Sequence, residues 1–200
     1  MRDLAPSRVP LRPRAGSPRR IALMPAYNED ATVVAVLERL EPLVDEIIVV
    51  DDGSTDRTRE VVFDWAKSRP HVQLICLHRN RGMSAAYYAA LREVRQRVAL
   101  GEISPDDIVL TLDADGQHEP ARIEALVARL VEGRFDAVIA RRDLSSYTLY
   151  KRLGNWLVSL WASLWADHRY YDVESGFRAF RVGALLAALS TTTATSTARQ

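Results

Sequence analysis

Two carboxylates one residue apart could hold a metal-bound diphosphate. Asp113 and Asp115 follow the apolar run 108–112, and a polar turn then leads the chain into the next segment. Hard cations such as Mg²⁺ or Mn²⁺ prefer oxygen ligands and keep coordination positions open for substrate phosphates. An acidic pair at the end of a buried strand therefore suits such a diphosphate, although the same pattern is also typical of a solvated acidic turn.

Two earlier turns carry groups that could bind a nucleoside. The segment 25–30 offers a proline, the ring of Tyr27 and the carboxylate of Glu29, which could sandwich a base and bind its edge or ribose. Asp51 and Asp52 place two adjacent carboxylates where they could accept a hydrogen bond from the N–H of a base. Ser54 or Asp56 could also cap the next helix. The sequence has no GxGxxG or Walker-type loop, which argues against dinucleotides and ATP.

Short apolar runs alternate with segments of helical period. We expect strands at 21–24, 47–50, 72–77, 108–112 and 137–140. The helices between them should bury apolar residues at positions 33, 37, 40 and 44, then 61, 62 and 65, then 86, 90, 94 and 98, and finally 123, 127, 130 and 131. Glu29 and Asp30 should lie in the first turn of the first helix, where they favour its dipole.

This alternation predicts an α/β fold, with a mostly parallel central sheet and helices on both faces. Ligands of such sheets bind beyond the carboxyl ends of the strands. Polar segments follow all five expected strands, at 25–30, 51–56, 79–82, 113–118 and 141–143. Because these strand ends share one edge of the sheet, the sequence predicts a binding site there.

Composition indicates one globular domain with extended ends. The 200 residues are 48% hydrophobic and 26% charged, and the net charge is +1. Residues 1–20 carry six arginines and one aspartate, which leaves the remainder near −4 and argues against nucleic acid as a partner. We expect a basic disordered tail at 1–19, which could also attract anionic lipid, a folded domain at 20–189, and a frayed tail at 190–200. Cys76 is the one cysteine and is expected to be buried.

A further helix is expected at about 147–167. Trp156, Trp161 and Trp165 fall on one helical stripe, which suits a helix lying in a membrane interface. The same stripe would also suit packing against the domain or another subunit. At about ten residues its apolar core is shorter than the roughly twenty that span a bilayer.

The order of the motifs resembles a known family. Five segments carry the resemblance: Pro-Ala-Tyr-Asn-Glu, Val-Val-Asp-Asp-Gly-Ser-Thr-Asp, Arg-Asn-Arg-Gly, Asp-Ala-Asp-Gly-Gln-His and Ser-Gly-Phe-Arg. Over about residues 20–185 the chain is similar to family 2 glycosyltransferases, above all to the polyprenyl-phosphate (dolichyl-phosphate) mannosyl- and glucosyltransferases. The resemblance implies the GT-A (nucleotide-diphospho-sugar transferase) fold and a divalent cofactor, Mg²⁺ or Mn²⁺.

The resemblance also implies roles for individual residues. Nucleotide-sugar binding would fall to Pro25, Tyr27, Glu29, Val50, Asp52, Asp113, Ala114 and Asp115. Asp113, Asp115 and Gln117 would bind the metal, and Arg142, Lys151 and Arg178 the phosphate of the acceptor. Asp115, Arg142 and Arg178 would be the catalytic residues. Asp172 and Glu174 could supply a base if the acceptor were a sugar hydroxyl.

These matches predict a metal-dependent inverting hexosyltransferase. It would move a hexose from a nucleotide-diphosphate sugar, GDP-mannose or UDP-glucose, to a polyprenyl phosphate lipid. The membrane surface would then be a partner, with the protein peripheral at its cytoplasmic, inner face. The alternatives are transfer to a saccharide hydroxyl in cell-surface polysaccharide synthesis, or a catalytically silent nucleotide-binding remnant. Because the chain ends soon after Ser-Gly-Phe-Arg, we expect a domain shortened at its C-terminus that still binds the donor.

Overall fold

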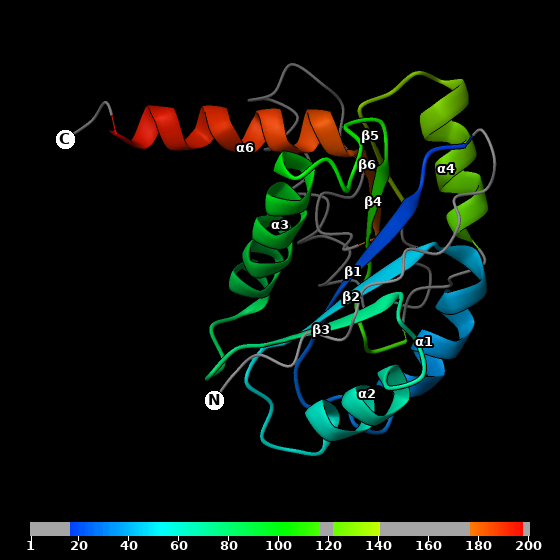
Figure 1. Cartoon of the computed structure of the whole chain (residues 1–200), viewed down its shortest axis with the longest axis vertical. Coiled ribbons are helices and arrows are strands. Elements are labelled where there is room, and N and C mark those ends of the chain that lie inside the picture. Colours follow the sequence, from blue (N-terminus) through cyan, green and yellow to red (C-terminus); the bar gives the residue numbers. More distant parts are fainter. Residues whose placement is uncertain (1–16, 117–121, 141–176, 198–200) are drawn as a thin grey trace, which may run out of the picture.

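The computed structural model describes residues 17–116, 122–140 and 177–197. Its elements alternate between strands and helices over most of the chain (Figure 1). They are β1 (Arg20–Ala26), α1 (Val33–Leu40), the 3-10 helix η1 (Glu41–Leu43), β2 (Glu46–Asp51), α2 (Thr58–Ala66), β3 (Val72–Cys76), α3 (Met83–Ala99), β4 (Ile108–Thr111), α4 (Ile123–Glu132), β5 (Ala137–Ile139), β6 (Arg178–Arg181) and α6 (Val182–Thr197).

One six-stranded sheet runs through the molecule in the order β3-β2-β1-β4-β6-β5. Strands β1 to β4 pair in parallel, as the alternation predicts. Strand β6, which the sequence did not predict, lies between β4 and β5 and runs antiparallel to both. Its amino end therefore reaches the edge of the sheet at which the carboxyl ends of β4 and β5 lie.

Apolar side chains on both faces of the sheet hold the layers together. Along β1, Ala22 and Met24 pack in one core cluster, whereas Ile21 and Leu23 pack in the other. Helices α1, α2 and α4 cover the first cluster, and α3 and α6 cover the second (Figure 1). The predicted α/β class and the helices on both faces are thereby confirmed.

Ion pairs fasten the opposite edge of the sheet. Arg97 of α3 is buried and pairs with Glu46 at the start of β2, at 2.8 Å from its Nη2. Arg19 donates to Asp107 just before β4, at 3.1 Å from Nε and 3.0 Å from Nη2. Both pairs lie at the amino ends of the strands, so they stabilise the scaffold without occupying the predicted site.

Several local predictions differ from the structure. Helix α1 begins at Val33, so Glu29 and Asp30 precede its first turn. Val131 is 38% exposed because it lies at the border of the apolar face of α4. Cys76 is exposed, because β3 is an edge strand that only β2 flanks. The backbone of α6 remains helical to Thr197, through most of the segment for which we expected a frayed tail.

No helix in the described ranges is both long enough and apolar enough to span a bilayer. The expected interfacial helix at 147–167 lies outside the described residues.

Candidate active site

We call the edge of the sheet at the carboxyl ends of the parallel strands the rim. The first two turns at this rim, after β1 and after β2, are held together by reciprocal hydrogen bonds. Asn28 has a left-handed backbone, φ 55°, and its amide N–H donates to Ser54 Oγ at 3.1 Å. Asn28 Oδ1 in turn accepts from the Thr55 amide at 2.9 Å, and the Glu29 amide donates to Thr58 Oγ1 at 2.7 Å. These bonds fix the turn that carries Tyr27 before any ligand arrives. Of the two residues predicted to cap α2, Ser54 therefore links the two turns instead.

The other predicted residue, Asp56, accepts a hydrogen bond at the start of α2. Its Oδ1 accepts from the amide of Thr58, the first residue of α2, at 2.9 Å. Its Oδ2 accepts from the Asp30 amide at 3.2 Å, so the same carboxylate also holds the first turn. Burial alone would raise the pKa of Asp56, but the hydrogen bonds from Thr58 and Asp30 outweigh it and lower that pKa.

Asp52 joins the second turn to the loop before α3. Its carboxylate is 3% exposed and accepts from the amides of Arg81 and Gly82 at 2.9 and 2.7 Å. Gly53 sits against the same loop: a Cβ there would lie 2.3 Å from the carbonyl carbon of Arg79. Residues 51–54 and 79–82 therefore form one rigid wall, and Asp52 contributes to it whether or not a base also contacts its remaining lone pairs.

Asp51 does not act as a second base-reading carboxylate. It is fully buried, and its Oδ2 accepts from Arg59 Nε and Nη2 of α2 at 2.9 and 2.8 Å. Its Oδ1 accepts from the Ser54 amide at 3.1 Å. The two adjacent aspartates thus bind different neighbours, Asp51 the guanidinium of Arg59 and Asp52 the amides before α3, so the predicted pairing of the two carboxylates in one site is wrong.

The other residues matched to nucleoside binding differ in their accessibility. Tyr27 is 41% exposed, and Glu29 Oε2 accepts from Thr32 Oγ1 at 2.6 Å. Pro25 is half-buried at the end of β1. Val50 is completely buried between β2 and the helices that cover that face, which leaves it no exposed surface for a base. The accessible wall is therefore made by the first turn, with Val50 supporting it from inside.

The acidic pair lies at the tip of the central strand β4. Asp113 and Asp115 are half-buried, Ala114 between them is 2% exposed, and Gly116 turns the chain with φ 75°. Ala114 packs in the core cluster beneath them, so it anchors the turn from below. The predicted metal ligand Gln117 lies outside the described residues.

The donor set at this tip fits a hard divalent cation. Among residues 17–116, 122–140 and 177–197, no group of three or more His, Cys, Asp or Glu side chains could enclose a metal. The described part of the rim thus supplies two carboxylates, and a bound ion would take further ligands from a diphosphate and water. That arrangement suits Mg²⁺ or Mn²⁺, which are commonly held by one or two carboxylates plus substrate phosphates.

Arg178 reaches the same rim from the far end of the sequence. As the first residue of β6, it is the register partner of Thr111 in β4 and of Ile139 in β5. Thr111 precedes Asp113 by two residues, so the antiparallel strand brings a guanidinium beside the acidic turn. Arg142 and Lys151, the other predicted phosphate ligands, lie outside the described residues, as do Asp172 and Glu174.

Tyr87 belongs to this group, although sequence reasoning missed it. It projects from α3 with a buried hydroxyl. Its pKa is raised, first by burial and then by the negative charge of Asp113, while Thr111 and Arg178 partly offset the rise. The tyrosine, the first acidic residue and the arginine are therefore close enough to influence one another. In the sequence Tyr87 lies next to the buried alanines of α3, a position that is typical of a residue of the hydrophobic core.

A mostly parallel sheet with one reversed strand, two turns held by hydrogen bonds and an acidic pair near an arginine suit an enzyme that binds a nucleotide sugar. The family model for glycosyl transferase family 2 matches residues 21–185. The chain therefore belongs to family 2 of the glycosyltransferases, and the predicted family and enzyme class are confirmed.

Individual relatives agree with this family. The chain is 33% identical over 166 residues to an undecaprenyl-phosphate 4-deoxy-4-formamido-L-arabinose transferase of Pseudomonas paraeruginosa, covering 80% of this chain and 46% of that protein. It is 28% identical over 180 residues to an undecaprenyl-phosphate mannosyltransferase of Micrococcus luteus, covering 84% of this chain and 69% of the relative. The chain thus spans about half the length of the first relative and about two thirds of the second.

A solved structure shows the same fold. Glucosyl-3-phosphoglycerate synthase from Mycobacterium tuberculosis, crystallised with Mn²⁺, UDP-glucose and phosphoglyceric acid, superposes with a TM-score of 0.61 at 23% identity. The match covers 84% of this chain and 58% of that one. The predicted GT-A fold is confirmed.

Proposed function

We propose that this protein is a metal-dependent inverting glycosyltransferase that moves a hexose from a nucleotide-diphosphate sugar to a polyprenyl phosphate. One observation carries the proposal furthest: β6 runs against its neighbours and brings Arg178 to the rim that holds Asp113 and Asp115. Positive charge at that position is what a departing diphosphate requires. The locked turns at 26–30 and 51–58 would receive the nucleoside on the same rim.

The reaction would be a single displacement at the anomeric carbon. A phosphate oxygen of the acceptor forms the new bond while the bond to the nucleoside diphosphate breaks, so the sugar inverts. A lipid monophosphate is already largely ionised near neutral pH, because the second pKa of a phosphate monoester is about 6. The acceptor therefore needs cationic groups to position it and does not need a general base.

The chain's own residues have separable tasks in this scheme. Tyr27 presents its ring to the base, and the hydrogen bonds around Asn28 and Asp52 hold the wall in position. Arg178 neutralises phosphate charge at the end of β4, where its planar fork can bind two oxygens. A divalent ion, when held by Asp113 and Asp115, supplies additional positive charge to the leaving diphosphate. Gln117, Arg142 and Lys151 are proposed to complete the site on the strength of the motif match.

The names of similar proteins support the choice of donor and acceptor. Two of the relatives are undecaprenyl-phosphate transferases, one of which transfers mannose, and the solved neighbour was crystallised with UDP-glucose and Mn²⁺. We therefore propose GDP-mannose or UDP-glucose as donor and a polyprenyl phosphate as acceptor. Such an acceptor resides in a membrane and such donors in the cytoplasm, which would place the protein at the inner face.

Transfer of radiolabelled sugar into organic-extractable lipid tests this proposal. Purified protein should transfer label from GDP-mannose or UDP-glucose to a polyprenyl phosphate in the presence of Mn²⁺ or Mg²⁺. The product should release its sugar in mild acid, as a sugar–phosphate–lipid bond does. Asp115→Ala should abolish the transfer. An acid-stable product would instead indicate a saccharide acceptor, and equal transfer by Asp115→Ala would contradict the metal site.

A further inference from the structure

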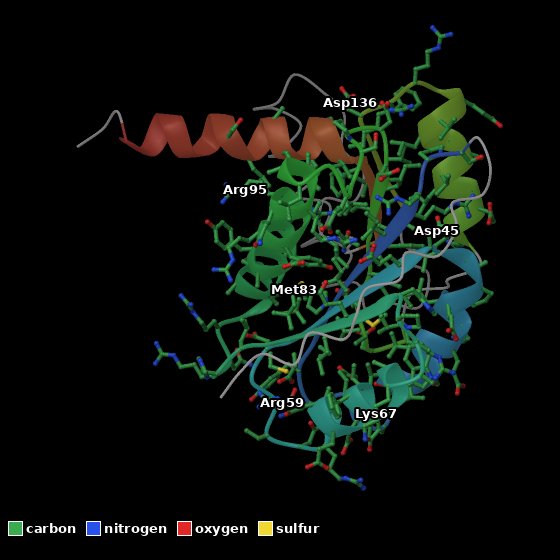
Figure 2. The ribbon with its side chains drawn as sticks, viewed as in Figure 1. Asp45, Arg59, Lys67, Met83, Arg95 and Asp136 are labelled. Carbon is green, nitrogen blue, oxygen red and sulfur yellow. The ribbon has the colours of Figure 1, made fainter. Side chains whose placement is uncertain are left out.

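Exposed basic residues lie on the outer side of helix α3 and in the loop just before it. Tyr88, Arg92 and Arg95 are exposed and recur at intervals of four and three residues, which places them on one side of α3, and the exposed Arg81 lies in the loop that precedes Met83. The opposite side buries Ala86, Ala90 and Val94 against the sheet. We call Arg81, Tyr88, Arg92 and Arg95 the α3 basic face; Figure 2 labels Arg95 on the outer side of α3.

The arginines of this face have no acidic partner within the described part of the chain. Neither Arg79, in the preceding loop, nor Arg81, Arg92 or Arg95 forms a side-chain hydrogen bond or ion pair with another described residue. Elsewhere in the structure Arg19, Arg59 and Arg97 are each paired with a carboxylate. A helix surface that merely faces solvent usually alternates charges in pairs three or four residues apart, and this one does not.

The local charge balance reinforces the contrast. Residues 77–100 contain five arginines and a single acidic residue, the half-buried Glu93, whereas the whole chain has a net charge of only +1. Arg97 is neutralised inside by Glu46, so four guanidiniums remain for an external partner. Tyr88, 62% exposed, adds an aromatic ring with a polar tip among them.

We propose that the α3 basic face docks the protein onto an anionic lipid bilayer. Guanidinium groups bind lipid phosphates, and clusters of basic residues near a surface are attracted to anionic leaflets. Tyrosine is favoured at the level of lipid headgroups. Arg81, in the loop, lies beside the turn that Asp52 holds, and the helical part of the face extends about 10 Å along α3 from Tyr88 to Arg95. Docking there would keep the active-site rim close to the membrane.

This inference rests on the proposed lipid acceptor for its biological purpose, but its test does not. Vesicles of phosphatidylcholine, with and without phosphatidylglycerol and free of any polyprenyl phosphate, would be sedimented with the full-length protein at low and high salt. The test variant is Arg92→Gln/Arg95→Gln. The matched control is Arg39→Gln/Arg134→Gln, which removes the same charge from exposed positions on the α1 and α4 side of the sheet. A second variant, Tyr88→Ser, tests the aromatic contact.

The unmodified protein should bind vesicles that contain phosphatidylglycerol, and high salt should weaken that binding. Arg92→Gln/Arg95→Gln should lower the partition coefficient by about ten-fold or more, whereas the control should lower it clearly less. Tyr88→Ser should lower it by a smaller factor. Nucleotide binding should be unchanged in all three variants, which separates loss of docking from misfolding.

Three outcomes would overturn the docking proposal. They are equal losses in the test and control variants, binding that is indifferent to phosphatidylglycerol, and a change of oligomeric state in the test variant with vesicle binding intact. The last would assign the α3 basic face to a second copy of the chain. Failure of the proposed reaction looks different, because docking would persist while no sugar is transferred in the radiolabel assay.

Discussion

Arg178 stands opposite Thr111 in the antiparallel pairing of β6 with β4. Thr111 leads directly into the turn that carries Asp113 and Asp115, so the register sets how near the guanidinium lies to both carboxylates. Strands β1 to β4 pair with one another in parallel, so their carboxyl ends lie at one rim. Because β6 runs in the opposite direction, its first residue lies at that same rim. Two segments far apart in the sequence thereby complete one charged site.

Replacing Arg178 should impair catalysis more than folding. Because charge on the leaving diphosphate is greatest in the transition state, Arg178→Gln should lower kcat by about 10²- to 10³-fold, and Arg178→Lys should lower it less. Steady-state kinetics with a nucleotide sugar would measure this effect. Arg181→Gln, at the other end of β6 where the side chain contacts the Phe135 carbonyl, is the control and should retain near-normal kcat. Similar losses in both variants would mean that β6 matters only as structure.

Gly53 should be irreplaceable for packing. It has φ 68°, and a Cβ would meet the backbone of Arg79 at 2.3 Å, so Gly53→Ala should cost about 2–5 kcal/mol of unfolding free energy. Gly101 also has a left-handed backbone, φ 73°, but open space around its Cβ position. Gly101→Ala should therefore cost only about 1–2 kcal/mol. Urea denaturation would measure the loss of unfolding free energy in both variants. Equal losses would show that the loop at Arg79 can move to make room for the added methyl group at position 53.

Tyr87 should make the protein sensitive to alkali. Burial and Asp113 raise its pKa in the folded state, whereas in the unfolded chain a tyrosine titrates near about 10. A raised folded pKa gives stability that is present below about pH 10 and lost as the pH rises further. The stability of the unmodified protein should therefore fall relative to Tyr87→Phe as the pH rises from about 9 to about 11.

The exposed neighbour provides the control for that measurement. Tyr88→Phe removes a hydroxyl from a ring that is 62% exposed, so its unfolding free energy should follow that of the unmodified protein across the same pH range. Parallel curves for the unmodified protein and Tyr87→Phe would show that the buried hydroxyl does not ionise on unfolding.

Asp56 should act at the acidic end of the pH scale. Its pKa is lowered in the folded protein, because the hydrogen bonds from Thr58 and Asp30 outweigh the opposite effect of burial. A lowered folded pKa gives stability that is present above the unfolded value, about 4, and lost as the pH falls below it. The advantage of the unmodified protein over Asp56→Asn should therefore shrink below about pH 4. Asp106→Asn, at an exposed position, should show no such convergence.

Sequence reasoning predicted the framework well, for identifiable reasons. The runs ending at Met24, Val50 and Leu112 are apolar on both faces of the sheet, so their burial could be read directly from composition. Strand β6 was missed because it has no apolar run. Only two apolar residues, Ala179 and Phe180, lie between Arg178 and Arg181. Its antiparallel insertion depends on partners far away in the chain.

The site was predicted in outline, and its internal bonding was not. The acidic pair and the first turn do share one rim, since both follow parallel strands. The division between Asp51 and Asp52 could not be predicted, because each finds its partners, Arg59 and the amides before α3, only after the loops fold. The role of Ser54 as a link to Asn28, in place of a helix cap, depends on the same tertiary contacts.

The most direct measurement is thermal unfolding with GDP or UDP, each with and without Mn²⁺. A ligand that binds only the folded state raises the melting temperature. At least one of the two nucleotides should raise it when Mn²⁺ is present and much less without the metal, and Asp115→Ala should abolish the metal-dependent part. A rise that is the same with and without Mn²⁺, or that survives Asp115→Ala intact, would contradict a nucleotide-sugar site built on the acidic pair.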